Sequence, residues 1–261
     1  MTDGVVVLPA AGGAPLDVLT GPGTARAVVG PATGAKHRSM WVLDLEPGTA
    51  TIELRHPSEA VYYVVWGDGH VLVPAAGEAL VLGPGAMVHV EAGAAYTLVA
   101  DGEALRVVGG PSPPDPGWHG GVAAAAPAAR GRVRLFHRDK PSAHMPVIAA
   151  DARLVVWPGV DAHTANMNYV RIAAGEANVA HAHASSEDTI VILSGRGTVE
   201  DLTHGVTQPF ETGDVIHVPP AVEHRVRADR GEAVSSCGGP CPPDPAMLRL
   251  AEPIDDAATR R

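Results

Sequence analysis

An internal repeat is the feature that most limits the folds open to this chain. The segment VVGGPSPPDPGW at 107–118 returns as SCGGPCPPDPAM at 236–247. Three further segments return in the same order at nearly the same offset: 25–31 at 152–158, 40–48 at 167–175, and 82–96 at 211–224. A repeat that keeps its order over the 261 residues indicates two tandem copies of one structural unit.

Each copy is predicted to be an all-β domain. Segments rich in β-branched and apolar residues, separated by Gly, Asp-Gly and Pro, occur at 59–73, 86–93, 96–110, 189–202, 213–220 and 223–237. The 30 Gly and 24 Pro residues show no collagen-like period, which fits many turns between short strands of a sandwich or barrel. We expect domains at 1–120 and 132–261, joined by an Ala/Pro linker at 121–131.

Helix signals are weak, and composition excludes several classes of partner. Only 244–252 favours a short helix, with Asp244 as its cap. A net charge of −10 argues against nucleic acid and anionic membrane surfaces. No apolar run reaches the about 18 residues of a membrane span, and 1–13 does not resemble a signal peptide, so we expect a cytoplasmic protein. Cys237 and Cys241 are expected to be free thiols.

Two histidines one residue apart mark the most distinctive segment, GEANVAHAHASSEDTIVILSGRG at 175–197. Residues i and i+2 of a strand face the same side, so His181 and His183 should project together. Glu187 or Asp188 opens the next expected strand, and His224 begins a later one. Three imidazoles and a carboxylate can hold a transition metal and leave positions open for substrate, oxygen or water.

These segments resemble the two sequence motifs of the cupin family. The first motif is a Gly, five residues, His-x-His, three or four residues, Glu, six residues and Gly; GDVIHVPPAVEH resembles the second, with Ala221 where Gly is usual. Together with the repeat, the resemblance implies a bicupin of two tandem jelly-roll-like β-barrels. It further implies that His181, His183, a carboxylate and His224 bind one divalent Fe, Mn, Ni or Zn ion, with Fe or Mn favoured.

The spacing leaves the carboxylate open. Counting forward from His183, both Glu187 and Asp188 fit, and counting back from Gly195 selects Asp188. Glu59 of the first copy occupies the position equivalent to Glu187, and Glu is the usual ligand with the longer reach. We therefore prefer Glu187 and keep Asp188 as the alternative.

The first copy is predicted to lack a metal site. Leu54 replaces the first histidine and Tyr96 the last, while His56 and Glu59 remain. Two candidate ligands make a poor metal site, so this barrel is expected to serve stability, dimerisation or the wall of the active site.

Two other sets of residues receive interpretations of their own. His89 and His217 are equivalent in the two copies, which favours a structural role. Alternation along a strand predicts that Asn168 and Tyr169 face opposite sides.

The resemblance implies a metal-dependent enzyme acting on a small polar substrate, with a homodimer expected. A dioxygenase-like oxidoreductase is the leading hypothesis, since an intact set of three histidines and a carboxylate is commonest among such members. The alternatives are a hydrolase or aminohydrolase similar to ureidoglycine aminohydrolase, an isomerase, or a decarboxylase. A ligand-binding bicupin without catalysis is a further alternative, and bound metal would distinguish it from an enzyme.

Overall fold

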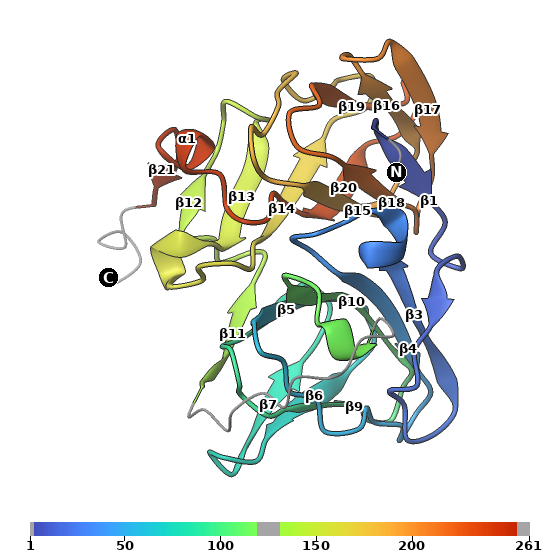
Figure 1. Cartoon of the computed structure of the whole chain (residues 1–261), viewed down its shortest axis with the longest axis vertical. Coiled ribbons are helices and arrows are strands. Elements are labelled where there is room, and N and C mark those ends of the chain that lie inside the picture. Colours follow the sequence, from blue (N-terminus) through green and yellow to red (C-terminus); the bar gives the residue numbers. More distant parts are fainter. Residues whose placement is uncertain (1–2, 119–130, 255–261) are drawn as a thin grey trace.

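The computed structural model describes residues 3–118 and 131–254. Two β-barrels lie one above the other, and each combines one large sheet with one three-stranded sheet (Figure 1). The expected all-β class with two tandem barrels and little helix is therefore confirmed. Most of the expected linker at 121–131 lies outside the described residues.

The strands of the N-terminal barrel follow the apolar segments of the first copy. Its large sheet has the order β11 (Val133–His137), β8 (Ala86–Val90), β5 (Glu59–Trp66), β10 (Leu105–Ser112), β4 (Met40–Leu45), β3 (Gly23–Val29) and β2 (Ala14–Pro15). Its small sheet has the order β7 (Glu78–Leu82), β6 (Gly69–Val73) and β9 (Thr97–Ala100). Neighbouring strands pair antiparallel throughout.

The C-terminal barrel repeats this arrangement. Its large sheet has the order β1 (Val6–Leu8), β18 (Val215–Val218), β15 (Asp188–Ser194), β20 (Val234–Gly238), β14 (Met167–Ile172), β13 (Asp151–Val156), β12 (Ala143–His144) and β21 (Glu252–Pro253). Its small sheet has the order β17 (Val206–Phe210), β16 (Gly197–Asp201) and β19 (His224–Ala228).

The first strand of each copy belongs to the barrel of the other copy. β1 pairs with β18 of the C-terminal barrel, and β11 pairs with β8 of the N-terminal barrel. The sheets therefore depart from the expected division into 1–120 and 132–261. A strand of three to five residues carries no local signal for which sheet edge it will join, so the sequence pattern could not reveal this exchange.

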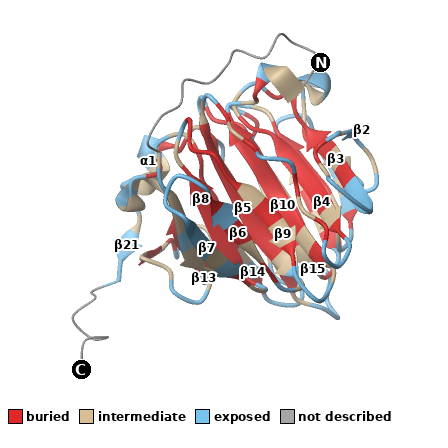
Figure 2. Ribbon diagram, turned by 90° about the horizontal axis from the view of Figure 1, so that it is seen from below, coloured by how far each residue is buried: buried red, intermediate tan, exposed pale blue. Residues whose placement is uncertain are grey.

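Alternation along the strands gives each large sheet two buried faces. On β4, Trp41 and Leu43 point into the barrel core, whereas Met40 and Val42 belong to a second cluster that also contains residues of the C-terminal barrel. The large sheets thus pack against each other through an apolar layer. Figure 2 shows the central strands buried along most of their length. Such strands read as near-continuous hydrophobic runs, as the sequence does here.

Among the described residues, helical structure is confined to single turns. The expected C-terminal helix is confirmed in shortened form as α1 (Pro245–Leu248), and the Asp244 side chain accepts a hydrogen bond from the Ala246 N–H, as expected of a cap. Residues 3–118 and 131–254 also contain three 3-10 turns: η1 (Pro31–Thr33), η2 (Pro116–Trp118) and η3 (Pro158–Val160). No helix among the described residues combines the length and hydrophobicity needed to cross a membrane.

Candidate metal centre

Backbone pairing brings the three histidines of the second copy together. The His181 N–H donates to the His224 carbonyl at 3.1 Å and the His224 N–H donates back to the His181 carbonyl at 2.9 Å. The two rings lie 4.4 Å apart between centroids, and His183 follows on the same side at 5.1 Å from His181. The expectation that His181 and His183 project together is confirmed.

Asp188, at the start of β15, is the carboxylate that faces these rings. Its Oδ2 lies 3.5 Å from the Nε2 of His224 and 3.8 Å from the Nε2 of His183. One ligand atom each from His181, Asp188 and His224 lies within 4.8 Å of the other two. We call His181, His183, Asp188 and His224 the histidine–aspartate cluster.

The hydrogen bonds of the imidazoles fix their tautomers. Nδ1–H of His181 donates to the Val179 carbonyl at 2.8 Å, and Nδ1–H of His224 donates to the Val222 carbonyl at 3.1 Å. A carbonyl oxygen can only accept, so both Nδ1 atoms carry a proton, which leaves Nε2 as the atom through which the neutral ring presents its lone pair. This is the state in which histidine binds a metal through Nε2.

The Nδ1 of His183 is oriented by a carboxylate in place of a backbone carbonyl. Its Nδ1 lies 2.9 Å from the Oδ2 of Asp244, which also caps α1. A metal-bound histidine commonly donates its other N–H to a carboxylate, which orients the ring and raises its basicity. Asp244 therefore acts as a positioning residue for the cluster.

The cluster gathers electron-rich atoms that have no partner among the described residues. The Nε2 atoms of His183 and His224 and the Oδ1 of Asp188 are buried and make no hydrogen bond. Burial and the neighbouring His224 lower the pKa of His181 to about 4, so the ring is neutral at pH 7. Burial raises the pKa of Asp188, but the nearby imidazoles of His224 and His183 outweigh this and hold the pKa well below its usual range, so the carboxylate is ionised. Lone pairs and a negative charge converging in a buried site fit a divalent cation.

Glu187 does not join this cluster. Its two carboxylate oxygens accept hydrogen bonds from the backbone N–H groups of Lys36 at 2.7 Å and His37 at 2.9 Å, in the other barrel. Successive side chains point to opposite sides of an extended chain, so Glu187 and Asp188 cannot both face the imidazoles. The structure thus brings Asp188, the alternative, to the position for which Glu187 was preferred.

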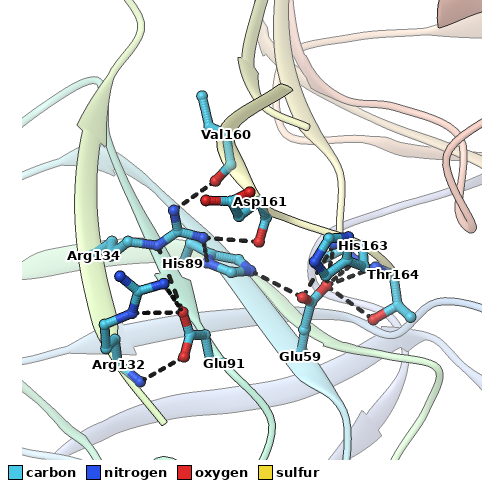
Figure 3. Close-up of polar contacts among 10 residues, drawn as sticks. Glu59, His89, Glu91, Arg132, Arg134, Val160, Asp161, His163 and Thr164 are labelled. Atoms are coloured by element: carbon cyan, nitrogen blue, oxygen red, sulfur yellow. Dashed lines mark hydrogen bonds and ion pairs between the residues drawn. The ribbon is translucent and has the colours of Figure 1, made fainter. Parts of the chain in front are cut away.

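Glu59 shows that this anchoring role is repeated in the first copy. Figure 3 shows its carboxylate directed at the backbone of His163 and Thr164, with His89 beside it. Its Oε2 accepts N–H bonds from His163 at 2.9 Å and Thr164 at 2.6 Å. Burial raises the pKa of Glu59, but the contact with His89 and these N–H donors outweigh it and hold the pKa well below its usual range. The two equivalent glutamates therefore tie each barrel to a loop of the other.

The equivalent histidines His89 and His217 lie beside these glutamates. The Nε2 of His89 is 3.6 Å from Glu59, and the Nε2 of His217 is 3.9 Å from Glu187. Arg134 of β11 donates to the Nδ1 of His89 at 3.0 Å (Figure 3). These positions support the structural role expected for both.

The equivalent place in the N-terminal barrel is filled by a closed hydrogen-bond network. The Nδ1 of His56 lies 3.0 Å from Asp115, and its Nε2 lies 2.9 Å from the hydroxyl of Tyr96. The Tyr96 hydroxyl also lies 2.6 Å from that of Tyr62, while Leu54 is fully buried. Both ring nitrogens of His56 are thus engaged. Among the described residues, the group with metal-ligand geometry is in the C-terminal barrel.

The histidine–aspartate cluster opens into a cavity of the C-terminal barrel. Asn168 of β14 lines this cavity, whereas Tyr169 packs in the layer between the barrels, so the expected alternation is confirmed. Most of the wall is apolar, with contributions from Met145, Ile148, Leu154, Val170, Met247 and Leu248. Cys237 and Cys241 are buried free cysteines, as expected.

The sequence reasoning missed Asp244 as part of the site. Asp244 is expected only as a helix cap, and its segment, GGPCPPDP, is used only as evidence of the internal repeat. The recurrence did carry a signal: Asp115 and Asp244 are equivalent, and each bonds the second histidine position of its own barrel. A repeated acid beside a repeated histidine could have indicated a pair.

The left-handed turn before His224 explains why glycine is usual at the position that Ala221 occupies here. Ala221 adopts φ 64°, a conformation that favours glycine. Its N–H donates to the His183 carbonyl at 2.7 Å, so the turn is kept in spite of the alanine.

Comparisons with known proteins agree on the fold. The structure is similar to an oxalate decarboxylase from Lactobacillus farciminis in complex with formate (TM-score 0.70, 15% identity, 91% of this chain and 86% of that chain). It is also similar to protein Ylba from E. coli (TM-score 0.70, 14% identity, 94% and 93%) and to vicilin from hazelnut, Corylus avellana (TM-score 0.64, 13% identity, 90% and 85%). No curated protein matches the chain significantly.

Two matches to one family model decide the family. The cupin-domain model matches residues 41–108 and again residues 168–235, which together make up more than half of the chain. Each range lies within one of the two sequence copies and covers central strands of one barrel. The chain therefore belongs to the cupin family, as a protein with two tandem cupin domains.

Proposed function

We propose that this protein is a metal-dependent enzyme whose active site is the C-terminal barrel, with His181, His183, Asp188 and His224 holding one divalent ion. The observation that carries the proposal is that unpartnered, buried Nε2 and carboxylate atoms lie close together beside a cavity. An apolar barrel core has no structural need for such a group, because uncompensated buried polar atoms are destabilising.

The chain's own residues would prepare this centre before any substrate arrives. The carbonyls of Val179 and Val222 and the carboxylate of Asp244 hold the three rings as Nδ1–H tautomers. The bound ion would act as a Lewis acid and offer open coordination positions. Imidazole and carboxylate donors suit Fe and Mn, which are the favoured metals. The apolar wall would keep bulk water from the reacting groups.

A dioxygenase-like oxidoreductase is the reaction class we favour. Four protein donors leave up to two positions of a six-coordinate ion, enough for a small substrate and O₂ together. A decarboxylase is the second candidate, since an oxalate decarboxylase shares the fold. An oxalate decarboxylase and a vicilin are both similar to this structure, and a fold alone does not decide function.

Metal analysis by ICP-MS on untagged protein tests the proposal. We expect about one Fe or Mn ion per chain, lost in the double variant His181→Ala/His183→Ala. The matched control His137→Ala/His144→Ala removes two histidines outside the cluster and should keep the metal. Equal metal in both double variants, or none in the wild type, would refute the proposed centre.

Oxygen uptake then separates the two reaction classes. An oxygen electrode would follow the metal-loaded protein while a panel of small acids, diketones and phenols is presented. Uptake that disappears in His224→Ala supports a dioxygenase. Carbon dioxide release without oxygen consumption would contradict the dioxygenase assignment and support a decarboxylase.

A further inference from the structure

Outside the histidine–aspartate cluster, most of the lining of the active-site cavity is apolar. Leu154 and Val170 contribute from β13 and β14, and Met247 and Leu248 from α1. Leu154 also belongs to an apolar cluster that extends to the C-terminal segment. A ligand in this cavity would contact mainly aliphatic groups and thioethers, which accommodate apolar shapes.

The charges of the site balance once a divalent ion is counted. Asp188 and Asp244 are the two carboxylates that contact the cluster histidines, so together they offset the charge of a doubly charged cation. One negative charge on a ligand could bind directly to the ion, but a second would need another partner.

No arginine or lysine is free to supply that partner among the described residues that line the cavity. Arg153 is the one cationic residue of the lining. Its guanidinium donates to Asp151 at 2.6 Å and to Asp139 at 2.9 Å and stacks on Tyr169, which packs between the barrels. Its charge is thus already compensated away from the cluster.

Amide groups provide the polar contacts instead. Asn168 lines the cavity, and its Oδ1 is buried without a hydrogen-bond partner; the same holds for the Oδ1 of Asn166. A buried acceptor without a partner is costly, and a ligand hydroxyl or N–H would satisfy it. Neutral amides orient a ligand without compensating a charge.

We propose that the cavity takes a small, mainly apolar ligand with at most one negative charge. Its polar end would bind the metal, and Asn168 would accept a hydrogen bond from it. The inference rests on the proposed metal centre and narrows its substrate class. It disfavours compact dianions such as oxalate for this chain, since their second charge would lie unpaired against an apolar wall.

A matched pair of probes tests the inference on Mn-loaded protein by isothermal titration calorimetry. 4-Methyl-2-oxopentanoate and 2-oxoglutarate share the 2-oxo acid group that can bind the metal. The first carries an isopropyl group where the second carries a carboxymethyl group, which adds a second negative charge. We expect the apolar acid to bind about tenfold more tightly or better, because a buried unpaired charge is strongly unfavourable. Oxalate should bind more weakly than the apolar acid.

A charge added to the wall should reverse this preference. Ile148→Lys places an amine in the half-buried lining, and Ile148→Met is the control of similar volume. We expect Ile148→Lys to improve 2-oxoglutarate binding relative to the apolar acid and Ile148→Met to leave the ratio unchanged.

The metal content of the same samples separates the possible failures. Metal-loaded protein that binds the dianions as well as or better than the apolar acid, or binds none of the probes, overturns the inference and leaves the metal centre standing. Protein that takes up no metal overturns both.

Discussion

Substitution of the neighbouring acids Glu187 and Asp188 is predicted to have different effects: loss of Glu187 should lower folding stability, and loss of Asp188 should weaken metal binding. Glu187 accepts two backbone N–H bonds from Lys36 and His37, and its side chain is 3% exposed. A hydrogen bond to a charged group contributes about 1.5–3 kcal/mol to stability. Because Lys36 itself is exposed, we take the lower end and expect Glu187→Ala to lower the free energy of unfolding by about 3 kcal/mol. For a chain of this size that corresponds to a Tm about 6–12 °C lower.

Asp188→Asn should weaken metal binding and leave the stability of the metal-free protein nearly unchanged. Removing the carboxylate deletes the charge that faces the Nε2 atoms of His183 and His224, so metal binding should fall by about 10-fold or more. The metal-free protein should lose little stability, since the wild-type cluster brings unpartnered acceptors together.

Thermal denaturation of the metal-free proteins and ICP-MS of the metal-loaded proteins measure both effects. The reasoning predicts Glu187→Ala to be destabilised but still to bind metal. A Glu187→Ala variant that keeps its Tm and loses the metal would refute it, and would restore Glu187 as the ligand.

Four further changes have defined outcomes. Asp244→Asn should weaken metal affinity by about 10–100-fold in a metal titration, while the matched Asp115→Asn should not. Tyr96→Phe should destabilise the protein by about 1–3 kcal/mol in urea unfolding without changing metal content, because it breaks the hydrogen-bond network of the N-terminal barrel. Ala221→Gly should stabilise it by about 1 kcal/mol by relieving a left-handed alanine; an unchanged midpoint would contradict this. The pKa of Glu59 is held below its ordinary value near 4.5, so its stabilising effect is complete above that pH and is lost as pH falls below it. The stability advantage of wild type over Glu59→Gln should therefore shrink between pH 7 and pH 3, and a constant difference would contradict the anchoring role.

The sequence predicted those features that depend on local pattern and spacing. The repeat predicted two barrels, and the alternation of strands predicted that His181 and His183 would share a face. Spacing alone could not choose between Glu187 and Asp188, because counting residues does not say which side of an extended chain faces the core. The equivalence of Glu59 and Glu187 was real, but it reflected an anchor between barrels rather than a ligand.

Features that depend on contacts between residues far apart in the sequence could not be predicted from local patterns. The pairing of β1 and β11 with the opposite barrels depends on packing between sheets, and neither strand carries a local signal for it. The partnership of Asp244 with His183 joins positions 61 residues apart in sequence. The sequence also could not show that Arg153, the cationic residue of the cavity lining, is already paired with Asp151, because that pairing depends on where the guanidinium lies.

The central claim is that a single metal ion is held by His181, His183, Asp188 and His224. A crystal of the Mn-loaded protein, with an anomalous difference map calculated from data near the manganese absorption edge, tests it most directly. The account predicts one strong peak per chain in the C-terminal barrel, within coordination distance of each of the three Nε2 atoms and of a carboxylate oxygen of Asp188. A peak bound by Glu187, a peak in the N-terminal barrel, or no peak in metal-loaded crystals would contradict it.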